Sequence, residues 1–130
     1  MNTEVSRIMV LDDESKILKL IVKIFNDLPI HITTANTGEE GLKIIKNSKS
    51  FAVIISDYYM GPGMNGGEFL KLVAEYSPKT IRILMTGGID RGSLVESVAN
   101  GEFEGYSIKP FLVDNFIDQV QRSIQEYENI

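Results

Sequence analysis

The sequence predicts an α/β protein with a doubly wound sheet of five parallel strands, and three observations support this. Short apolar runs alternate with stretches of helical periodicity along the chain. The 130 residues, 43% of them hydrophobic, have the length and composition of one domain. Three of the strand-like runs are continuously apolar, as strands covered on both faces are, and alternation of strand with helix is typical of parallel sheets.

The first strand–helix unit begins with the apolar run Ile8–Leu11. Apolar side chains then recur every three or four residues over 17–28, which predicts one helix stripe. Pro29 is expected to end this helix. We expect Asp13 or its neighbour Ser15 to act partly as the N-cap of the helix.

The second unit opens with residues 30–34, where apolar and polar side chains alternate as in a half-exposed strand. Thr37 is the expected N-cap of the next helix. Glu40 follows three residues later, the spacing of a capping box. We expect this helix to extend to about Asn47.

The third unit is a buried strand followed by a long loop. Residues 52–55 are continuously apolar and lead directly into Ser56 and Asp57. The loop 60–66 is rich in glycine. An apolar stripe at helical spacing then predicts a helix over 69–76, which Pro78 closes.

The last two units complete the pattern. Residues 81–85 form an apolar strand that ends at Thr86, and Asp90 or Ser93 is expected to cap a short fourth helix. Residues 103–108 are the fifth strand. The apolar stripe of a closing helix follows over 113–127, with Asp114 near its start.

The strand order follows from the polarity of the strands. The runs around Val10, Ile54 and Ile83 are the most continuously apolar and should be central. The strands around His31 and Glu104 carry polar residues and should be edges. The order 2-1-3-4-5 satisfies both conditions, and it is the flavodoxin-like doubly wound arrangement.

Composition excludes several classes of function. The chain has 18 acidic and 13 basic residues, a net charge of −5, which argues against a direct nucleic-acid binder. It has no cysteine, so disulfides and Cys-ligated metals are excluded. With no signal-peptide pattern and no membrane-length apolar run, we expect a soluble, cytoplasmic protein that does not contact the membrane.

The residues of chemical interest follow the strands. In open α/β sheets, ligands bind beyond the carboxyl ends of the strands where the strand order reverses. For this order the reversal lies between strands 1 and 3. The side chains expected at this edge are Asp12, Asp13, Asp57, Thr86 and Lys109.

This set of side chains predicts phosphoryl transfer. Three neighbouring carboxylates repel one another, and a hard cation such as Mg²⁺ with oxygen ligands removes the conflict. Lys109 and Thr86 supply a charge and a hydrogen bond for phosphoryl oxygens. Asp57 is the expected nucleophile, giving an aspartyl phosphate, because Asp12 and Asp13 form the metal-holding pair.

From Ile8 to about Tyr127 the chain resembles the receiver domain of two-component response regulators, including the chemotaxis regulators. The residues that carry the resemblance are Asp12-Asp13, Asp57, Met60, Pro62-Gly63-Met64-Asn65-Gly66, Glu68-Phe69-Leu70, Thr86, Tyr106 and Lys109-Pro110. The resemblance implies that residues 1–130 form a single receiver domain with no effector domain.

The resemblance also implies the partners and the metal ligands. A histidine kinase or a histidine phosphotransfer protein would donate the phosphoryl group to Asp57. Mg²⁺ would be held by Asp13 and Asp57, with Asp12 helping through water and the backbone oxygen of Tyr59 completing the set. The chain would catalyse its own phosphorylation and dephosphorylation and would otherwise not be an enzyme.

A switch is implied as well. Thr86 would move inward and let the ring of Tyr106 rotate, which changes the face formed by the fourth helix, fifth strand and fifth helix. A downstream protein, or an effector domain of a longer protein, would read that face. It is also the expected surface for a homodimer.

The loop after Asp57 departs from the family pattern. Nine positions separate Asp57 from Gly66, where the family has eight, and Gly61 is the inserted residue. Tyr59 and Gly88 occupy two positions that tune dephosphorylation in the family. We hypothesise that Tyr59 shields the acyl phosphate from water.

Alternative readings exist for the same residues. Gly61–Gly66 matches the glycine pattern of dinucleotide-binding loops, but Thr86 stands where an acidic residue is expected. An aspartate-nucleophile phosphatase would have a second Asp at the position of Tyr59. A receiver that docks partners without phosphorylation stays open.

Three lysines on the first helix, Lys16, Lys19 and Lys23, form either a solvated face or a docking ring for the phosphodonor. His31 is the one histidine, and on an edge strand it is expected to be a surface residue.

Overall fold

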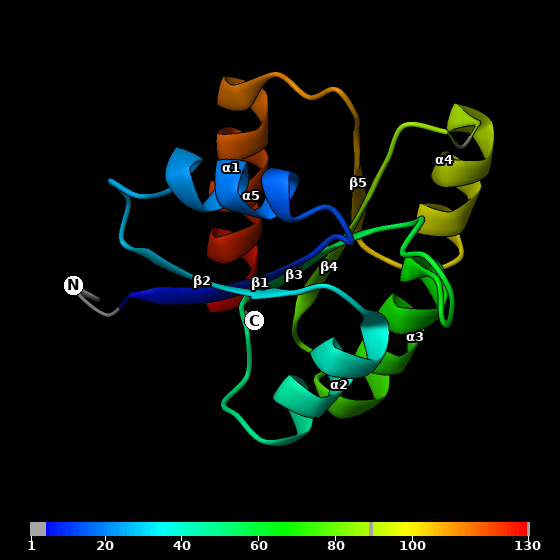
Figure 1. Ribbon diagram of the computed structural model, residues 1–130, viewed down its shortest axis with the longest axis horizontal. Coiled ribbons are helices and arrows are strands. Elements are labelled where there is room, and N and C mark those ends of the chain that lie inside the picture. Colours follow the sequence, from blue (N-terminus) through cyan, green and yellow to red (C-terminus); the bar gives the residue numbers. More distant parts are fainter. Residues whose placement is uncertain (1–4, 89, 130) are drawn as a thin grey trace.

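The protein is a five-stranded parallel sheet with helices on both faces (Figure 1). The structure, a computed structural model, describes residues 5–88 and 90–129. The strand order is β2-β1-β3-β4-β5, which confirms the predicted arrangement. The elements are β1 Ser6–Leu11, α1 Ser15–Ile24, β2 Ile30–Ala35, α2 Gly38–Lys46, β3 Val53–Asp57, α3 Gly66–Tyr76, β4 Ile81–Thr86, α4 Arg91–Ala99, β5 Gly105–Ile108 and α5 Val113–Glu128.

The central strands are more deeply buried than the edge strands. Every residue of β3 and β4 is buried, as are the last four of β1, whereas β2 and β5 are largely half-buried. This is the distribution that the polarity of the strands predicts.

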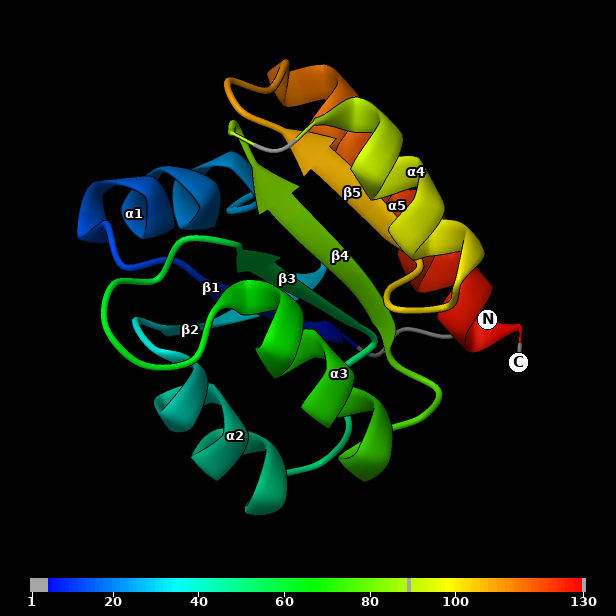
Figure 2. The same cartoon turned by 90° about the vertical axis from the view of Figure 1, so that its right-hand side faces the viewer.

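Two hydrophobic clusters cover the two faces of the sheet. On one face, α1 and α5 bury side chains such as Ile21, Phe25 and Phe116. On the other, α2, α3 and α4 contribute to a cluster that includes Phe69 and Leu94. Figures 1 and 2 show α1 and α5 on one side, α2 and α3 on the other, and α4 at the β4–β5 end of the sheet.

The first helix is shorter than the sequence pattern predicts. It ends at Ile24 with Phe25 as its C-cap, and a turn separates it from Pro29, so the prediction that the proline ends the helix is wrong. Phe25 is 1% exposed and belongs to the hydrophobic cluster on this face of the sheet. The N-cap is Glu14, neither Asp13 nor Ser15.

Other boundaries also differ. Thr37 caps α2 as predicted, but the Glu40 carboxylate accepts from the N–H of Asn36 at 3.4 Å instead of closing a capping box on Thr37. A complete capping box, which the sequence analysis does not predict, occurs at α3 between Asn65 and Glu68. The fifth strand begins at Gly105, two residues later than predicted.

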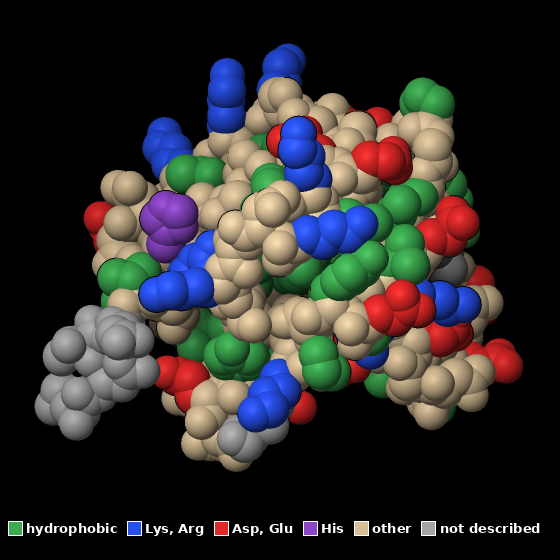
Figure 3. Space-filling view, turned by 90° about the horizontal axis from the view of Figure 1, so that it is seen from below, with side chains coloured by type: hydrophobic (Ala, Val, Ile, Leu, Met, Phe, Trp, Pro, Cys, Tyr) green, Lys and Arg blue, Asp and Glu red, His purple; other side chains and the backbone are tan. Residues whose placement is uncertain are grey.

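Figure 3, which looks onto α2 and α3, shows Lys and Arg side chains mixed with Asp and Glu instead of one continuous basic area. Among residues 5–88 and 90–129, no helix has the length and apolar character that crossing a bilayer requires.

Candidate functional site

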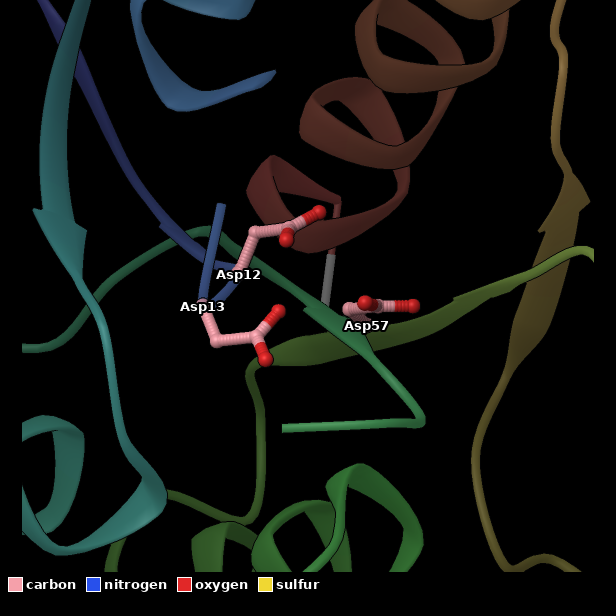
Figure 4. Close-up of side chains that lie close together, drawn as sticks. All are labelled: Asp12, Asp13 and Asp57. Atoms are coloured by element: carbon pink, nitrogen blue, oxygen red, sulfur yellow. The ribbon is translucent and has the colours of Figure 1, made fainter. Parts of the chain in front are cut away.

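Three carboxylates meet at the carboxyl edge of the sheet, between β1 and β3. Asp12 and Asp13 directly follow β1, and Asp57 is the last residue of β3. One carboxylate oxygen of each lies within 4.8 Å of the others (Figure 4). Asp12 is fully buried, Asp57 is 7% exposed and Asp13 is open to solvent. The predicted convergence at the reversal of strand order is therefore what the structure shows.

Lys109 is the cation of this cluster. Its ammonium lies 2.8 Å from Asp12 Oδ2 and 3.3 Å from Asp57 Oδ2, so it bridges the two carboxylates. The backbone fixes its position, because the N–H of Lys109 donates to the carbonyl of Thr86 at 3.0 Å and extends the β4–β5 ladder. Asp12 has a second structural contact: its Oδ1 accepts from the N–H of Glu14 at 2.9 Å, at the start of α1.

The charges of the site do not balance. Burial raises the pKa of Asp57, the charge of Asp12 raises it further, and the ammonium of Lys109 opposes both. Burial lowers the pKa of Lys109, but its hydrogen bond to Asp12 and the two carboxylate charges raise it above the usual lysine value. The site therefore keeps a protonated lysine and a carboxylate whose ionised form is disfavoured.

Thr86 and Tyr106 lie on the strands next to this cluster. Thr86 ends β4 and is 1% exposed, and its Oγ1 accepts from the N–H of Gly88 at 3.3 Å. Tyr106 of β5 is half-buried against the cluster that α3 and α4 cover, paired in register with Leu84. Thr86 shares the edge with the carboxylates, whereas Tyr106 lies farther down the sheet.

Gly66 is a site residue whose role the sequence did not reveal. A Cβ at this position would lie 2.0 Å from the backbone oxygen of Asp57, so no other residue fits without moving the chain. The N–H of Gly66 also donates to the carbonyl of Tyr58 at 2.9 Å. Gly66 therefore allows α3 to start directly against the end of β3. The close approach of two chain segments has no signature in local sequence.

The loop between β3 and α3 lies beside the pocket. Gly61 has φ +71°, and a Cβ there would lie 3.7 Å from Oδ2 of Asp13, so Gly61 lies next to the acidic cluster. The ring of Tyr59 is close to Gly88, with 3.3 Å from ring atom Cε2 to the point where a Cβ of Gly88 would lie. Tyr59 itself is 59% exposed. The role of its backbone oxygen stays a prediction.

The sheet order and the acidic edge together define the class of CheY-like doubly wound domains. A CheY-like response regulator receiver domain protein from Methanospirillum hungatei JF-1 is similar over 97% of this chain and 98% of its own, with 26% identity and a TM-score of 0.87. The chemotaxis response regulator CheY4 of Vibrio cholerae is similar over 92% of this chain and 98% of its own, with 28% identity and a TM-score of 0.79.

Within that class, residues 8–121 match the response regulator receiver domain, and the chain belongs to this family. The DNA-binding transcriptional regulator NtrC of Escherichia coli K12 is 32% identical over 121 residues, which are 93% of this chain and 25% of that protein. The hydrogenase transcriptional regulatory protein HoxA of Cupriavidus necator is 26% identical over 125 residues, which are 96% of this chain and 25% of HoxA. The chain thus spans about a quarter of the length of these relatives.

Proposed function

We propose that this receiver domain accepts a phosphoryl group on Asp57 from a phosphohistidine of a histidine kinase or a phosphotransfer protein. The observation that carries the proposal is the position of Asp57, at the end of the central strand β3, beside two further carboxylates and the ammonium of Lys109. An oxygen nucleophile beside a fixed cation and a candidate metal site is the arrangement that phosphoryl transfer requires.

The acidic cluster fits Mg²⁺. Its donors are carboxylate oxygens within 4.8 Å of one another, and neither His nor Cys belongs to the cluster found among the described residues. Such a donor set favours a hard cation over zinc or copper. Asp13 and Asp57 would hold the ion, with Asp12 acting mainly through water and the backbone oxygen of Tyr59 completing the set. When bound, Mg²⁺ neutralises charge on the transferring phosphoryl oxygens.

The transfer itself uses three side chains. A carboxylate oxygen of Asp57 attacks phosphorus, a P–O bond forms and the P–N bond to the donor imidazole breaks, with the electron pair left on nitrogen. Lys109 exchanges its contact with Asp57 for a phosphoryl oxygen while keeping Asp12. The hydroxyl of Thr86 donates to another phosphoryl oxygen. In the dephosphorylation half of the cycle, water attacks phosphorus, the P–O bond to Asp57 breaks, and inorganic phosphate and the Asp57 carboxylate are released.

The phosphoryl group then acts as a switch. Movement of Thr86 towards the pocket frees space for the ring of Tyr106, and the surface formed by α4, β5 and α5 changes with it. A downstream protein, an effector domain or a second copy of the chain reads that surface. NtrC and HoxA are named as transcriptional regulators, so regulation of transcription through an attached effector is the output we favour, with residues 1–130 as the receiver unit.

A surface beside the pocket suits the phosphodonor. A shallow apolar cavity of about 340 Å³ is lined by Lys109 together with Ile17, Leu20, Pro110, Phe111 and Val113. The three lysines of α1, Lys16, Lys19 and Lys23, are all exposed. Apolar contacts with a cationic border provide both affinity and electrostatic steering for an acidic partner. This favours the docking interpretation of the α1 lysines.

Docking without phosphorylation is the second candidate, because the same cavity and lysines would serve it. The structure argues against the dinucleotide-binding interpretation. A pyrophosphate would bind the free backbone N–H groups at the start of α3. There the N–H groups of Asn65 and Glu68 already donate to side chains of the capping box. The phosphatase reading lacks its general acid, since the Tyr59 side chain stands at that position.

Phosphorylation by acetyl phosphate tests the proposal and separates it from docking. Wild type should gain one phosphoryl group in the presence of Mg²⁺ and none with a chelator. Asp57→Asn should gain none, whereas Asp118→Asn, which changes an exposed carboxylate of α5, should behave as wild type. Label that persists in Asp57→Asn, or no label in wild type, would overturn the assignment.

A further inference from the structure

Two asparagines of this chain are followed directly by glycine, in the pairs Asn65-Gly66 and Asn100-Gly101. This dipeptide is prone to deamidation, because glycine has no side chain to shield its backbone nitrogen from Cγ of the asparagine. Both pairs lie at a helix end, since Asn65 is the N-cap of α3 and Asn100 is the C-cap of α4. The same chemistry is therefore available at two places, and the surroundings of each pair decide where it occurs.

The surroundings of Asn65 prevent the reaction. Its Oδ1 accepts from the N–H of Glu68 at 2.9 Å, and its own N–H donates to the Glu68 carboxylate at 3.1 Å, so the capping box fixes the side chain. The backbone nitrogen of Gly66, which would have to attack, donates its proton to the carbonyl of Tyr58 at 2.9 Å. Gly66 is also buried, and an atom at its Cβ position would collide with the backbone oxygen of Asp57. A succinimide ring, whose new carbonyl lies beside the glycine Cα, has no room there.

The surroundings of Asn100 permit the reaction. Asn100 and Gly101 are both exposed, and apart from its chain neighbours no described atom lies within 4 Å of the Cβ position of Gly101. Among residues 5–88 and 90–129, no hydrogen bond holds the side chain of Asn100. The N–H of Gly101 donates to the carbonyl of Val98 at 3.0 Å, a bond of the last helical turn. Such a bond at an exposed helix end opens at low free energy, which frees the attacking nitrogen.

We propose that Asn100 is a site of spontaneous deamidation in the folded protein and that Asn65 is protected from it. The backbone nitrogen of Gly101 attacks Cγ of Asn100 and forms a C–N bond. The bond from Cγ to the side-chain nitrogen breaks, and that nitrogen leaves as ammonia with the proton of the Gly101 N–H. Water then opens the ring at either carbonyl carbon, which leaves aspartate or isoaspartate at this position and releases a proton.

The modification would lie next to the carbonyls that Arg82 binds. Arg82, the second residue of β4, is 7% exposed, and its guanidinium donates to the carbonyl of Gly101 at 3.2 Å and to that of Glu102 at 2.8 Å. Isoaspartate lengthens the backbone by one carbon atom directly before these carbonyls and displaces them from the guanidinium. Either product also adds a negative charge at the C-terminus of α4, where the helix dipole disfavours it. The modified protein is therefore expected to be less stable than the unmodified one.

Peptide mass mapping of the whole chain after incubation in mildly alkaline buffer tests the proposal. In the folded wild type, the peptide that contains Asn100 should convert to the acid at least about tenfold faster than the peptide that contains Asn65. In guanidinium chloride the fold no longer distinguishes the two pairs, and their rates should agree within about twofold. Asn100→Gln, whose longer side chain closes a ring far more slowly, should abolish conversion at this position. Asn115→Gln, which changes an exposed asparagine of α5, should leave it unchanged.

No conversion at Asn100 in the folded protein, or conversion at Asn65 that is as fast, would overturn the proposal. So would a preference for Asn100 that persists in guanidinium chloride, because it would arise from the neighbouring sequence and not from the fold. Anion exchange separates the modified protein by its added charge, and this form should unfold at a lower denaturant concentration than the unmodified protein. An unchanged midpoint would refute the effect on the Arg82 contacts.

Discussion

The sheet has an ionic cluster at each end, and the two clusters differ in charge balance. At the carboxyl edge, Asp12, Asp13 and Asp57 face the single ammonium of Lys109. At the amino end, the guanidinium of Arg82 meets one carboxylate and three carbonyl oxygens, and all its donors are used. No described buried side chain lacks a hydrogen-bond partner, so the difference is one of charge and not of unmade bonds.

This difference separates a site that binds a ligand from one that holds the fold. An excess of buried negative charge is costly unless a cation or a proton compensates it. A fully paired cluster gains nothing from a ligand and resists change. We therefore expect a bound cation to stabilise the protein at the carboxyl edge, and mutation to weaken it at the amino end.

The largest effect is expected from breaking the balanced cluster. Arg82→Met leaves the Glu104 carboxylate and three carbonyls without their partner, and should lower the free energy of unfolding by about 4 kcal/mol. Denaturant unfolding measures this change in the free energy of unfolding. Arg122→Met, at an exposed ion pair, should cost less than about 0.5 kcal/mol. A loss for Arg82→Met as small as that of the control would remove the distinction between the two clusters.

A smaller loss is expected from removing the one cation of the acidic edge. Lys109→Met leaves the fully buried Asp12 without its ammonium and should destabilise the metal-free protein by about 2 kcal/mol. Mg²⁺ should recover part of this loss, because an ion that binds the folded state alone raises its stability. Thermal unfolding with and without Mg²⁺ checks both. If Lys109→Met lost the same stability with Mg²⁺ as without it, the result would argue against a metal site.

Substitution of Asp57 is expected to raise the free energy of unfolding, in contrast to the two substitutions above. Because its pKa is raised, the ionised carboxylate destabilises the fold above that pKa and has no such effect below the ordinary value of 3.8. Asp57→Asn should therefore stabilise the protein at neutral pH by about 1 kcal/mol. The gain should shrink as the pH falls through the raised pKa. A loss of stability at neutral pH would show that Lys109 outweighs burial and repulsion.

The smallest effect concerns the lifetime of the phosphorylated state. If the ring of Tyr59 limits access of water to the pocket, Tyr59→Ala should hasten decay of phospho-Asp57 about threefold. Tyr76→Ala removes another exposed tyrosine, on α3 beside Lys46, and should leave decay unchanged. The half-life is measured after removing the phosphodonor. An unchanged half-life in Tyr59→Ala would refute the shielding hypothesis.

The acidic edge could be predicted from the sequence because the sheet topology determines which residues lie there. Once the strand order is known, the carboxyl ends of parallel strands lie together, and Asp12, Asp57 and Thr86 each end or follow a strand. Periodicity and polarity give that order without any knowledge of contacts. The residues of the site could therefore be identified from the sequence as those at the ends of the strands.

The amino-end cluster could not be predicted in the same way. Arg82 and Glu104 are 22 residues apart, and neither the pairing nor the carbonyl acceptors leave a periodic trace in the sequence. The late start of β5 has the same origin. Glu104 uses its side chain, where a strand would use its backbone, to accept from the N–H of Arg82. The close contact of Gly66 with the backbone of Asp57 is likewise decided by packing and leaves no local sequence pattern.

The most direct test of the phosphoacceptor assignment locates the modification in the unaltered protein. After treatment with acetyl phosphate and Mg²⁺, borohydride reduction of the acyl phosphate marks the modified aspartate, and peptide mass mapping finds it. The account predicts a mark at Asp57 that is absent without Mg²⁺. A mark at Asp12 or Asp13, or none at all, would contradict it.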